Sequence, residues 1–200
     1  MTGNGRGAVF IDRDGTLIEE VGYLNHISRL RHLPRSAEAV RKINHSGMLA
    51  FLVTNQSGVA RRIFDRDLVE TVHEEIRRHL GSEGAHLDGV YYCPHHPDAA
   101  DPRYREVCEC RKPKPGMILR AVEEHGADLS RSYLVGDTVT DLEAARHAGI
   151  TSVLVLTGYG RGELEYRIAH RKIHPAHVAE DLSAAVDWIL ARDGAARAGR

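Results

Sequence analysis

The chain has 200 residues, with 27 Lys and Arg against 28 Asp and Glu and a formal net charge of -1. This length suits one substantial domain with a well-buried core. The sequence has no long basic run, which argues against a nucleic-acid binder. It has neither an apolar run long enough to cross a bilayer nor, in its first residues MTGNGRG, the apolar region of a secretory signal. We therefore expect a single domain over 1–200, cytoplasmic and without a membrane or nucleic-acid partner.

Five short apolar runs rich in β-forming residues predict strands. They are AVFI (8–11), LAFLV (49–53), GVYY (89–92), SYLVG (132–136) and SVLVL (152–156). Near-continuous apolar runs are typical of parallel strands that are covered on both faces.

Segments of helical period lie between most of these runs. They are 36–45, a segment after the N-cap residue Asp65, 116–125, 139–148 and a final segment after Ser183. Alternating strands and helices predict an α/β domain with a doubly wound parallel sheet. We expect its core to span about 8–190, with frayed ends at residues 1–7 and 191–200.

Polar motifs follow the predicted strands, where a doubly wound sheet has its crevice. Asp12 and Asp14 follow the first strand and could share one site, since residues two apart in an extended chain point to the same side. Such close carboxylates need a cation or a proton between them. The remaining motifs are TNQSG (54–58), RKPKPG (111–116) and GDTVTD (136–141).

These residue types suit phosphoryl transfer. Asp12 is a candidate nucleophile that would form an aspartyl-phosphate, and Asp14 is its candidate acid/base partner. The hydroxyl of Thr54 and the amides of the turn that follows it could bind phosphate, and Lys112 supplies a cation. Each motif alone also fits an ordinary polar turn or a solvated side chain, so the prediction rests on their joint order.

The second acidic motif predicts a metal site. Asp137 could ligate Mg²⁺ together with Asp12 and Asp14, because Mg²⁺ prefers a few carboxylate or carbonyl oxygens plus water and phosphate. Asp141, four residues on, could brace the loop or a neighbouring side chain.

All three cysteines lie in CPHHP (93–97) and CEC (108–110). Cys93, His95, Cys108 and Cys110 match a closed structural zinc site, which would tie down the loop 93–110 and hold Arg111 and Lys112 at the crevice. The alternatives are free cysteines in a flexible loop, and His96 in place of His95 as the ligand.

The four motifs DRDGT, TNQSG, RKPKPG and GDTVTD resemble those of the haloacid-dehalogenase superfamily of phosphohydrolases. The resemblance implies Asp12 as nucleophile, Asp14 as general acid/base, Thr54 and Lys112 as phosphate stabilisers, and Asp137 as a metal ligand. It also implies that Mg²⁺ is bound by Asp12, by the backbone carbonyl of Asp14 and by Asp137.

Within that superfamily, YYCPHHP, TNQSGVAR and CECRKPKPGM are similar to the D-glycero-D-manno-heptose-1,7-bisphosphate 7-phosphatases and the related histidinol-phosphate phosphatases. Twelve residues between His95 and Cys108 favour the heptose enzymes, because the loop is shorter in the histidinol-phosphate enzymes. The resemblance implies a sugar bisphosphate substrate in nucleotide-heptose biosynthesis, for lipopolysaccharide or a similar polysaccharide. The substrate-binding positions it implies are Glu19, Glu20, Val21, Gly22, Asn55, Gln56, Ser57 and Arg111.

Two positions depart from the pattern of these relatives. Thr138 stands where a lysine is expected, and Arg62-Ile63 stand where a glycine is common. Substrate preference therefore stays open between the heptose bisphosphate, histidinol phosphate and other small sugar phosphates. An inactive zinc-stapled binding module and transfer of phosphate to an acceptor other than water are further alternatives. Short loops leave no room for a large cap domain, so we expect an open site. We also expect a monomer, because the sequence shows no long apolar surface stripe.

Overall fold

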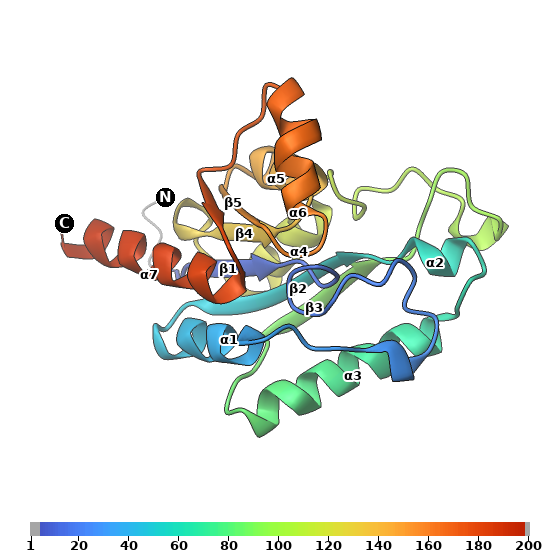
Figure 1. Ribbon diagram of the computed structural model, residues 1–200, viewed down its shortest axis with the longest axis horizontal. Helices are drawn as coiled ribbons and strands as arrows, with labels where there is room; N and C mark the ends of the chain where they lie inside the picture. The colour runs from blue at the N-terminus through green and yellow to red at the C-terminus, as the bar shows by residue number, and fades with distance from the viewer. Residues whose placement is uncertain (1–4, 199–200) are drawn as a thin grey trace.

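The computed structural model describes residues 5–198, and its centre is a six-stranded parallel sheet (Figure 1). The strands are β1 (Ala8–Ile11), β2 (Leu49–Asn55), β3 (Gly89–Cys93), β4 (Tyr133–Gly136), β5 (Thr151–Val155) and β6 (His177–Ala179). Their order across the sheet is β3-β2-β1-β4-β5-β6. The direction of winding changes between β1 and β4, so the predicted doubly wound parallel sheet is confirmed.

Within residues 5–198, seven α-helices connect and cover the strands. They are α1 (Ser36–His45), α2 (Ser57–Ala60), α3 (Arg66–Ser82), α4 (Gly116–His125), α5 (Val139–Ala148), α6 (Gly160–Gly162) and α7 (Leu182–Ala198). Short 3-10 turns lie at Ile27–Arg29, Pro102–Tyr104, Leu129–Arg131 and Ile168–His170, and a π-helical turn lies at Glu163–Arg167. The helices α1, α4 and α5 have the predicted bounds, and Asp65 caps α3 by accepting a hydrogen bond from the Leu68 amide at 2.9 Å, as predicted.

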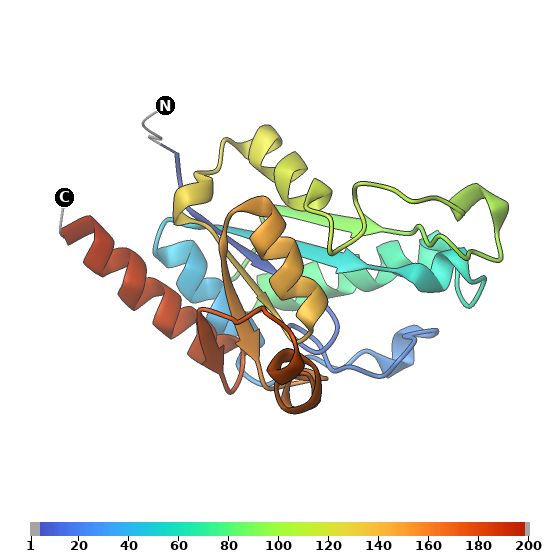
Figure 2. The ribbon, with the colours of Figure 1, turned by 90° about the horizontal axis from the view of Figure 1, so that it is seen from above.

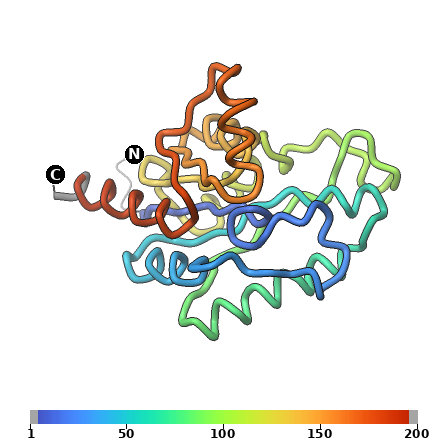
Figure 3. The backbone as a smooth tube through the Cα atoms, in the orientation of Figure 1, coloured from blue at the N-terminus to red at the C-terminus, as the bar shows by residue number. Residues whose placement is uncertain are grey.

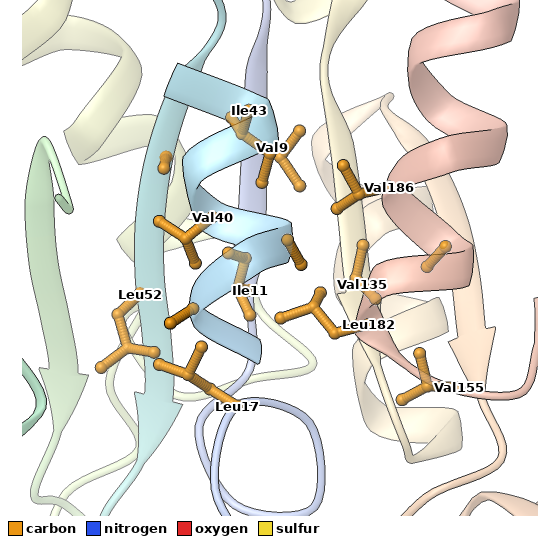
Figure 4. Close-up of a cluster of buried hydrophobic side chains, with 14 of the residues drawn as sticks. Val9, Ile11, Leu17, Val40, Ile43, Leu52, Val135, Val155, Leu182 and Val186 are labelled. Atoms are coloured by element: carbon orange, nitrogen blue, oxygen red, sulfur yellow. The ribbon is translucent and has the colours of Figure 1, made fainter. Parts of the chain in front are cut away.

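Successive side chains of a strand point to opposite faces of the sheet, so each strand contributes to two apolar layers. Val9 and Ile11 of β1 pack with α1, α3 and α7 on one face, and Ala8 and Phe10 pack with α4 and α5 on the other (Figure 2). Figure 4 shows the first layer, in which Val40 and Ile43 of α1 and residues of α7 lie over the strands. Both faces of the central strand are therefore buried, which explains why its sequence is apolar without alternation.

The structure corrects two expectations about minor elements. Strand β6 was not predicted, because a three-residue edge strand pairs only with β5 and has little apolar pattern of its own. The helical turns after β5, at Gly160–Gly162 and Glu163–Arg167, also have no clear period. The segment between β1 and α1 carries one 3-10 turn, and the described residues 5–198 contain no cap domain.

The expectation of frayed ends was wrong for the residues that the structure describes. Helix α7 continues to Ala198, and the Arg131 guanidinium holds its Asp193 carboxylate with nitrogen–oxygen distances of 3.0 and 2.9 Å. At the other end, Gly7 is buried and its carbonyl accepts from the Leu49 amide at 2.9 Å. Residues 1–4 and 199–200 lie outside the described part of the chain.

His73 on the buried face of α3 makes stability depend on pH. Neither ring nitrogen has a hydrogen-bond partner among residues 5–198, and burial, helped by Arg13 and Arg77, lowers the pKa of His73 from 6.5 to about 3. The unfolded chain therefore takes up a proton here before the folded protein does, so this stabilisation is complete above pH 6.5 and is lost as the pH falls.

We expect His73 to lower the free energy of unfolding by about 2 kcal/mol between pH 7 and pH 5. Urea unfolding of the wild type and of His73→Phe at both pH values measures this effect, because phenylalanine keeps a ring but cannot titrate. An equal loss of stability in the two proteins would show that His73 does not titrate as its environment indicates.

Candidate active site

The carboxyl ends of β1, β2 and β4 meet at one edge of the sheet. Ile11 pairs with Leu52 on one side and with Val135 on the other, so the polar residues after each strand converge there. A cavity of about 380 Å³ opens at this edge. Of the predicted site residues, the cavity is lined by Asp12, Asp14, Glu20, Gly22, Thr54, Asn55, Gln56, Ser57, Lys112 and Asp137.

Lys112 is a buried cation that contacts the acidic groups of the site. Its ammonium donates to Asp12 Oδ1 at 2.6 Å, to Asp141 Oδ1 at 2.6 Å and to the Val53 carbonyl at 2.9 Å. The side chain of Asn55 fixes the backbone of Lys112 through two hydrogen bonds, one donated and one accepted, each of 3.0 Å. The three donors of the ammonium are thus directed at fixed acceptors, one of which is the proposed nucleophile.

Loss of this cation should destabilise the fold. Lys112→Met leaves two buried carboxylates without their partner, which should lower the free energy of unfolding by about 3 kcal/mol. Lys114→Met is the matched control, because Lys114 forms an exposed pair with Glu109 and should contribute at most about 1 kcal/mol. Urea unfolding of the three proteins at pH 8 without added Mg²⁺ makes the comparison. Equal stability of the two variants would contradict the pairing.

Asp137 is held against the backbone of two neighbouring loops. Its Oδ2 accepts a hydrogen bond from the Tyr159 amide at 2.8 Å. A Cβ atom on Gly15 or on Gly158 would lie 2.1 Å from the same oxygen, and both glycines have positive φ. Gly15 in the first motif is therefore required both for its backbone conformation and for the space that the carboxylate occupies.

The buried acidic groups indicate a cation site. Burial, with the neighbouring Asp12 and Asp141, raises the pKa of Asp137 to about 9. Burial also raises the pKa of Asp12 to about 7, although Lys112 opposes this shift. One carboxylate oxygen from each of Asp12, Asp137 and Asp141 lies within 4.8 Å of the others. These residues fit a divalent cation, which would supply the positive charge that the cluster lacks.

Asp14 lies beside this cluster in a separate hydrogen-bond network. The Arg13 guanidinium donates to Asp14 Oδ1 and Oδ2, at 3.1 Å each, and the Gln56 side-chain amide donates to Asp14 Oδ2 at 2.9 Å. The same amide donates to the Thr54 hydroxyl at 2.8 Å. The prediction that the backbone amide of Gln56 binds phosphate is wrong, because this amide donates to the Cys93 carbonyl at 2.8 Å. The contacts of the Arg13 and Gln56 side chains with Asp14 were not predicted.

The two departures from the expected pattern have local structural explanations. Thr138 forms a capping box at the start of α5, in which Asp141 Oδ2 accepts from the Thr138 amide at 3.2 Å and from its hydroxyl at 2.6 Å. Asp141 therefore joins the helix start to Lys112. Arg62 has a φ of 58°, in the left-handed region where glycine is favoured.

Three predicted substrate-binding residues do not line the cavity, namely Glu19, Val21 and Arg111. Arg111 is instead half-buried, and its Nη1 donates to the His95 carbonyl at 3.1 Å. Their role in binding substrate stays a prediction. Aromatic residues that sequence reasoning missed do reach the cavity: Tyr23, Phe64 and Tyr159. No spacing links these three in the sequence, because they lie on separate loops.

Cys93, His95, Cys108 and Cys110 come together at the end of β3. Cys108 Sγ lies 3.4 Å from Cys93 Sγ and 3.2 Å from Cys110 Sγ, and His95 Nδ1 lies 3.4 Å from Cys110 Sγ. Four ligand atoms at such spacing fit a tetrahedral zinc ion with bonds of about 2.0–2.3 Å. His96 takes no part, since its ring accepts from the Asp98 amide at 3.0 Å and contacts Arg61.

The three sulfurs are crowded together and largely or partly buried. Contact with Cys110 and burial raise the pKa of Cys93, whereas contact with Cys93 lowers the pKa of Cys110 to about 5. A bound cation would allow all three sulfurs to act as thiolates.

Figure 3 traces the loop 93–110 beside the turn that carries α2, where the Asp101 amide donates to the Ala60 carbonyl at 3.0 Å.

Comparison with known proteins identifies the family. The HAD-hydrolase-like family model matches residues 109–185. The D-glycero-D-manno-heptose-1,7-bisphosphate 7-phosphatase of Thermosynechococcus vestitus is 44% identical, over 92% of this chain and 95% of that protein. The chain belongs to the heptose-1,7-bisphosphate phosphatase family. It is a phosphatase of the haloacid-dehalogenase type. The resemblances of its sequence to that superfamily and to the heptose-1,7-bisphosphate 7-phosphatases are therefore confirmed.

Further relatives agree with this assignment. The D-glycero-β-D-manno-heptose-1,7-bisphosphate 7-phosphatase of Yersinia pestis is 39% identical over 92% of this chain and 89% of that protein. The crystal structure of the heptose-bisphosphate phosphatase of B. bronchiseptica, complexed with magnesium and phosphate, superposes with a TM-score of 0.82 at 32% identity. That similarity covers 93% of this chain and 99% of the other. Family members therefore share this fold over nearly the whole chain.

Among residues 5–198, no helix is long and apolar enough to cross a membrane.

Proposed function

We propose that this protein is a Mg²⁺-dependent phosphatase that removes the 7-phosphate of D-glycero-D-manno-heptose 1,7-bisphosphate and leaves the 1-phosphate in place. The observation that carries the proposal is the buried group of Asp12, Lys112 and Asp137 at the carboxyl ends of the strands, in a chain of this family. In one cavity, Asp12 would supply the nucleophile, Lys112 the ammonium group that binds phosphate, and Asp12 and Asp137 the side-chain ligands of a metal ion.

In the first step, a carboxylate oxygen of Asp12 attacks the phosphorus atom of the 7-phosphate. The new oxygen–phosphorus bond forms as the bond to the sugar oxygen breaks, and Asp14 donates its proton to that oxygen, which leaves as an alcohol. Lys112 and the Thr54 hydroxyl stabilise the charge on the phosphoryl oxygens.

In the second step, water hydrolyses the aspartyl-phosphate. Asp14, now deprotonated, accepts a proton from the water as its oxygen attacks phosphorus. The bond between phosphorus and the Asp12 oxygen breaks, which releases inorganic phosphate and restores the Asp12 carboxylate. Water as the acceptor makes the reaction a hydrolysis rather than a transfer to another alcohol.

The side chains of Asp12 and Asp137, with the backbone carbonyl of Asp14, would hold Mg²⁺. Bound Mg²⁺ supplies positive charge against the phosphate oxygens. Cys93, His95, Cys108 and Cys110 would hold structural Zn²⁺, which ties the loop 93–110 and the neighbouring Arg111 in place. The proposed contacts to the substrate stay Glu19, Glu20, Val21, Gly22, Asn55, Gln56, Ser57 and Arg111.

The proposed product, a heptose 1-phosphate, suits later nucleotide activation on the way to heptose units of lipopolysaccharide or a similar polysaccharide. We place this reaction in the cytoplasm and propose that the protein acts as a monomer. Size-exclusion chromatography with light scattering tests the oligomeric state.

A substrate panel tests the proposed activity. Phosphate release with Mg²⁺ is measured from the α and β anomers of heptose 1,7-bisphosphate, from histidinol phosphate and from fructose 1,6-bisphosphate. We expect one heptose anomer to give the highest kcat/KM, by at least about tenfold, which corresponds to about 1.4 kcal/mol of transition-state discrimination. A highest value for histidinol phosphate, or equal values throughout, would overturn the substrate assignment.

A further inference from the structure

The side chain of Arg13, which follows Asp12 in the first motif, is buried at the lining of the cavity. It is 2% exposed. A buried guanidinium requires a charged partner, and Asp14 is the one carboxylate within ion-pair distance of Arg13 among the described residues. Nitrogen–oxygen distances of 3.0 and 3.1 Å place the planar fork of the guanidinium against both oxygens of the carboxylate.

Gln56 completes the contact from the neighbouring strand end. Its Oε1 accepts from Arg13 Nη2 at 2.8 Å, while its Nε2 donates to Asp14 Oδ2 at 2.9 Å. Because Gln56 is 4% exposed, this triangle of three side chains is largely excluded from water. The triangle leaves Asp14 little freedom to rotate, since each of its oxygens has at least one fixed donor.

The same amide connects the triangle to the phosphate side of the cavity. Gln56 Nε2 also donates to the Thr54 hydroxyl at 2.8 Å, so that hydroxyl is free to donate its own hydrogen elsewhere. The position of Gln56 is itself fixed by its backbone amide, which donates to the Cys93 carbonyl at 2.8 Å. The Gln56 side chain thus contacts both Asp14 and Thr54 and helps to orient both.

We infer that Arg13 and Gln56 are positioning residues, which hold the carboxylate of Asp14 in the orientation needed for proton transfer. This inference rests on the proposed function, in which Asp14 is the acid and base of an aspartyl-phosphate mechanism. Neither residue touches the reacting phosphorus. Their removal should therefore impair the steps in which Asp14 moves a proton and leave the attack by Asp12 intact. Replacement of Gln56 removes only a hydrogen bond that the Thr54 hydroxyl accepts, so this hydroxyl keeps its own hydrogen for phosphate.

Pre-steady-state kinetics with p-nitrophenyl phosphate separates these steps. Nitrophenolate leaves without needing a proton, so formation of the aspartyl-phosphate does not depend on Asp14, whereas its hydrolysis does. We expect Arg13→Met to retain a burst of about one nitrophenolate per enzyme and to lose about 10²-fold in the steady-state rate, as expected for loss of general acid–base catalysis. Gln56→Leu should show the same pattern with a smaller loss.

The reference variant is Asp14→Asn, which should give the same burst. In that background, Arg13→Met should cause no further loss, because its effect operates through Asp14. Arg13→Lys should recover part of the steady-state rate. Retention of the wild-type steady-state rate in both Arg13→Met and Gln56→Leu, a burst reduced together with the steady-state rate, or additive losses with Asp14→Asn would each overturn the inference.

Arg13→Met could fail to fold, because it removes a buried charge partner, and Gln56→Leu then decides alone, by the same burst. The proposed substrate is tested separately. If the wild type hydrolyses p-nitrophenyl phosphate but not heptose 1,7-bisphosphate, the substrate assignment fails, whereas the burst measurement still decides the roles of Arg13 and Gln56.

Discussion

Asp12→Asn should lower the rate of phosphate release by about 10⁴-fold or more, because an amide oxygen cannot replace the carboxylate as the nucleophile. Initial rates with p-nitrophenyl phosphate and with the sugar bisphosphates measure the loss. A rate within tenfold of the wild type would contradict the assignment of Asp12 as the nucleophile.

The same substitution should leave the fold intact. Burial raises the pKa of Asp12 from 3.8 to about 7. The free energy of unfolding therefore falls as the pH rises from 3.8 to about 7, because the folded protein must then hold a buried ionised carboxylate. Asparagine removes that cost at pH 8, and Lys112 keeps Asp141 and the Val53 carbonyl as partners. We therefore expect no fall in the thermal unfolding temperature in Mg²⁺-free buffer. A loss of activity accompanied by unfolding would not count as support.

Cys108→Ser should release zinc and destabilise the protein. Cys108 Sγ lies 3.4 Å from Cys93 Sγ and 3.2 Å from Cys110 Sγ, and loss of one of four ligands should reduce bound zinc from about one ion per chain to well under half. The free energy of unfolding should fall by about 3 kcal/mol or more, since metal binding contributes directly to the folding of such loops. Zinc content by elemental analysis and urea unfolding provide the two measurements.

His96→Ala is the matched control for this prediction. His96 lies next to His95 in the same loop but is outside the group of four ligand atoms. The His96→Ala protein should retain zinc, and its free energy of unfolding should change little. Normal zinc content in Cys108→Ser, or loss of zinc in His96→Ala, would show that the ligand set is wrong.

The central sheet could be predicted because its strands are short, apolar on both faces and separated by helices with clear starts and ends. The segment 36–45 is an example, since its helical period and the glycine that follows at position 47 predict both ends of α1. Strand β6 could not be predicted in the same way. Its three residues form only through pairing with β5, which is tertiary information.

The site residues could be gathered from the sequence because each follows a strand, but their contacts could not. Adjacency of β1 with both β2 and β4 decides that Asp12, Thr54 and Asp137 meet, and strand order is not encoded in any one motif. Arg13 illustrates the limit. No role was predicted for this residue from its place between two aspartates, whereas the fold buries it against Asp14 and Gln56. Arg111 illustrates the converse, because it lies outside the cavity lining.

The most direct test of the proposed activity is to follow heptose 1,7-bisphosphate by ³¹P NMR with the wild type and Mg²⁺, using Asp12→Asn as the blank. The account predicts that the 7-phosphate signal is replaced by inorganic phosphate while the 1-phosphate signal persists, and that the blank shows no change. Loss of the 1-phosphate, loss of both phosphates at equal rates, or release by Asp12→Asn would contradict it.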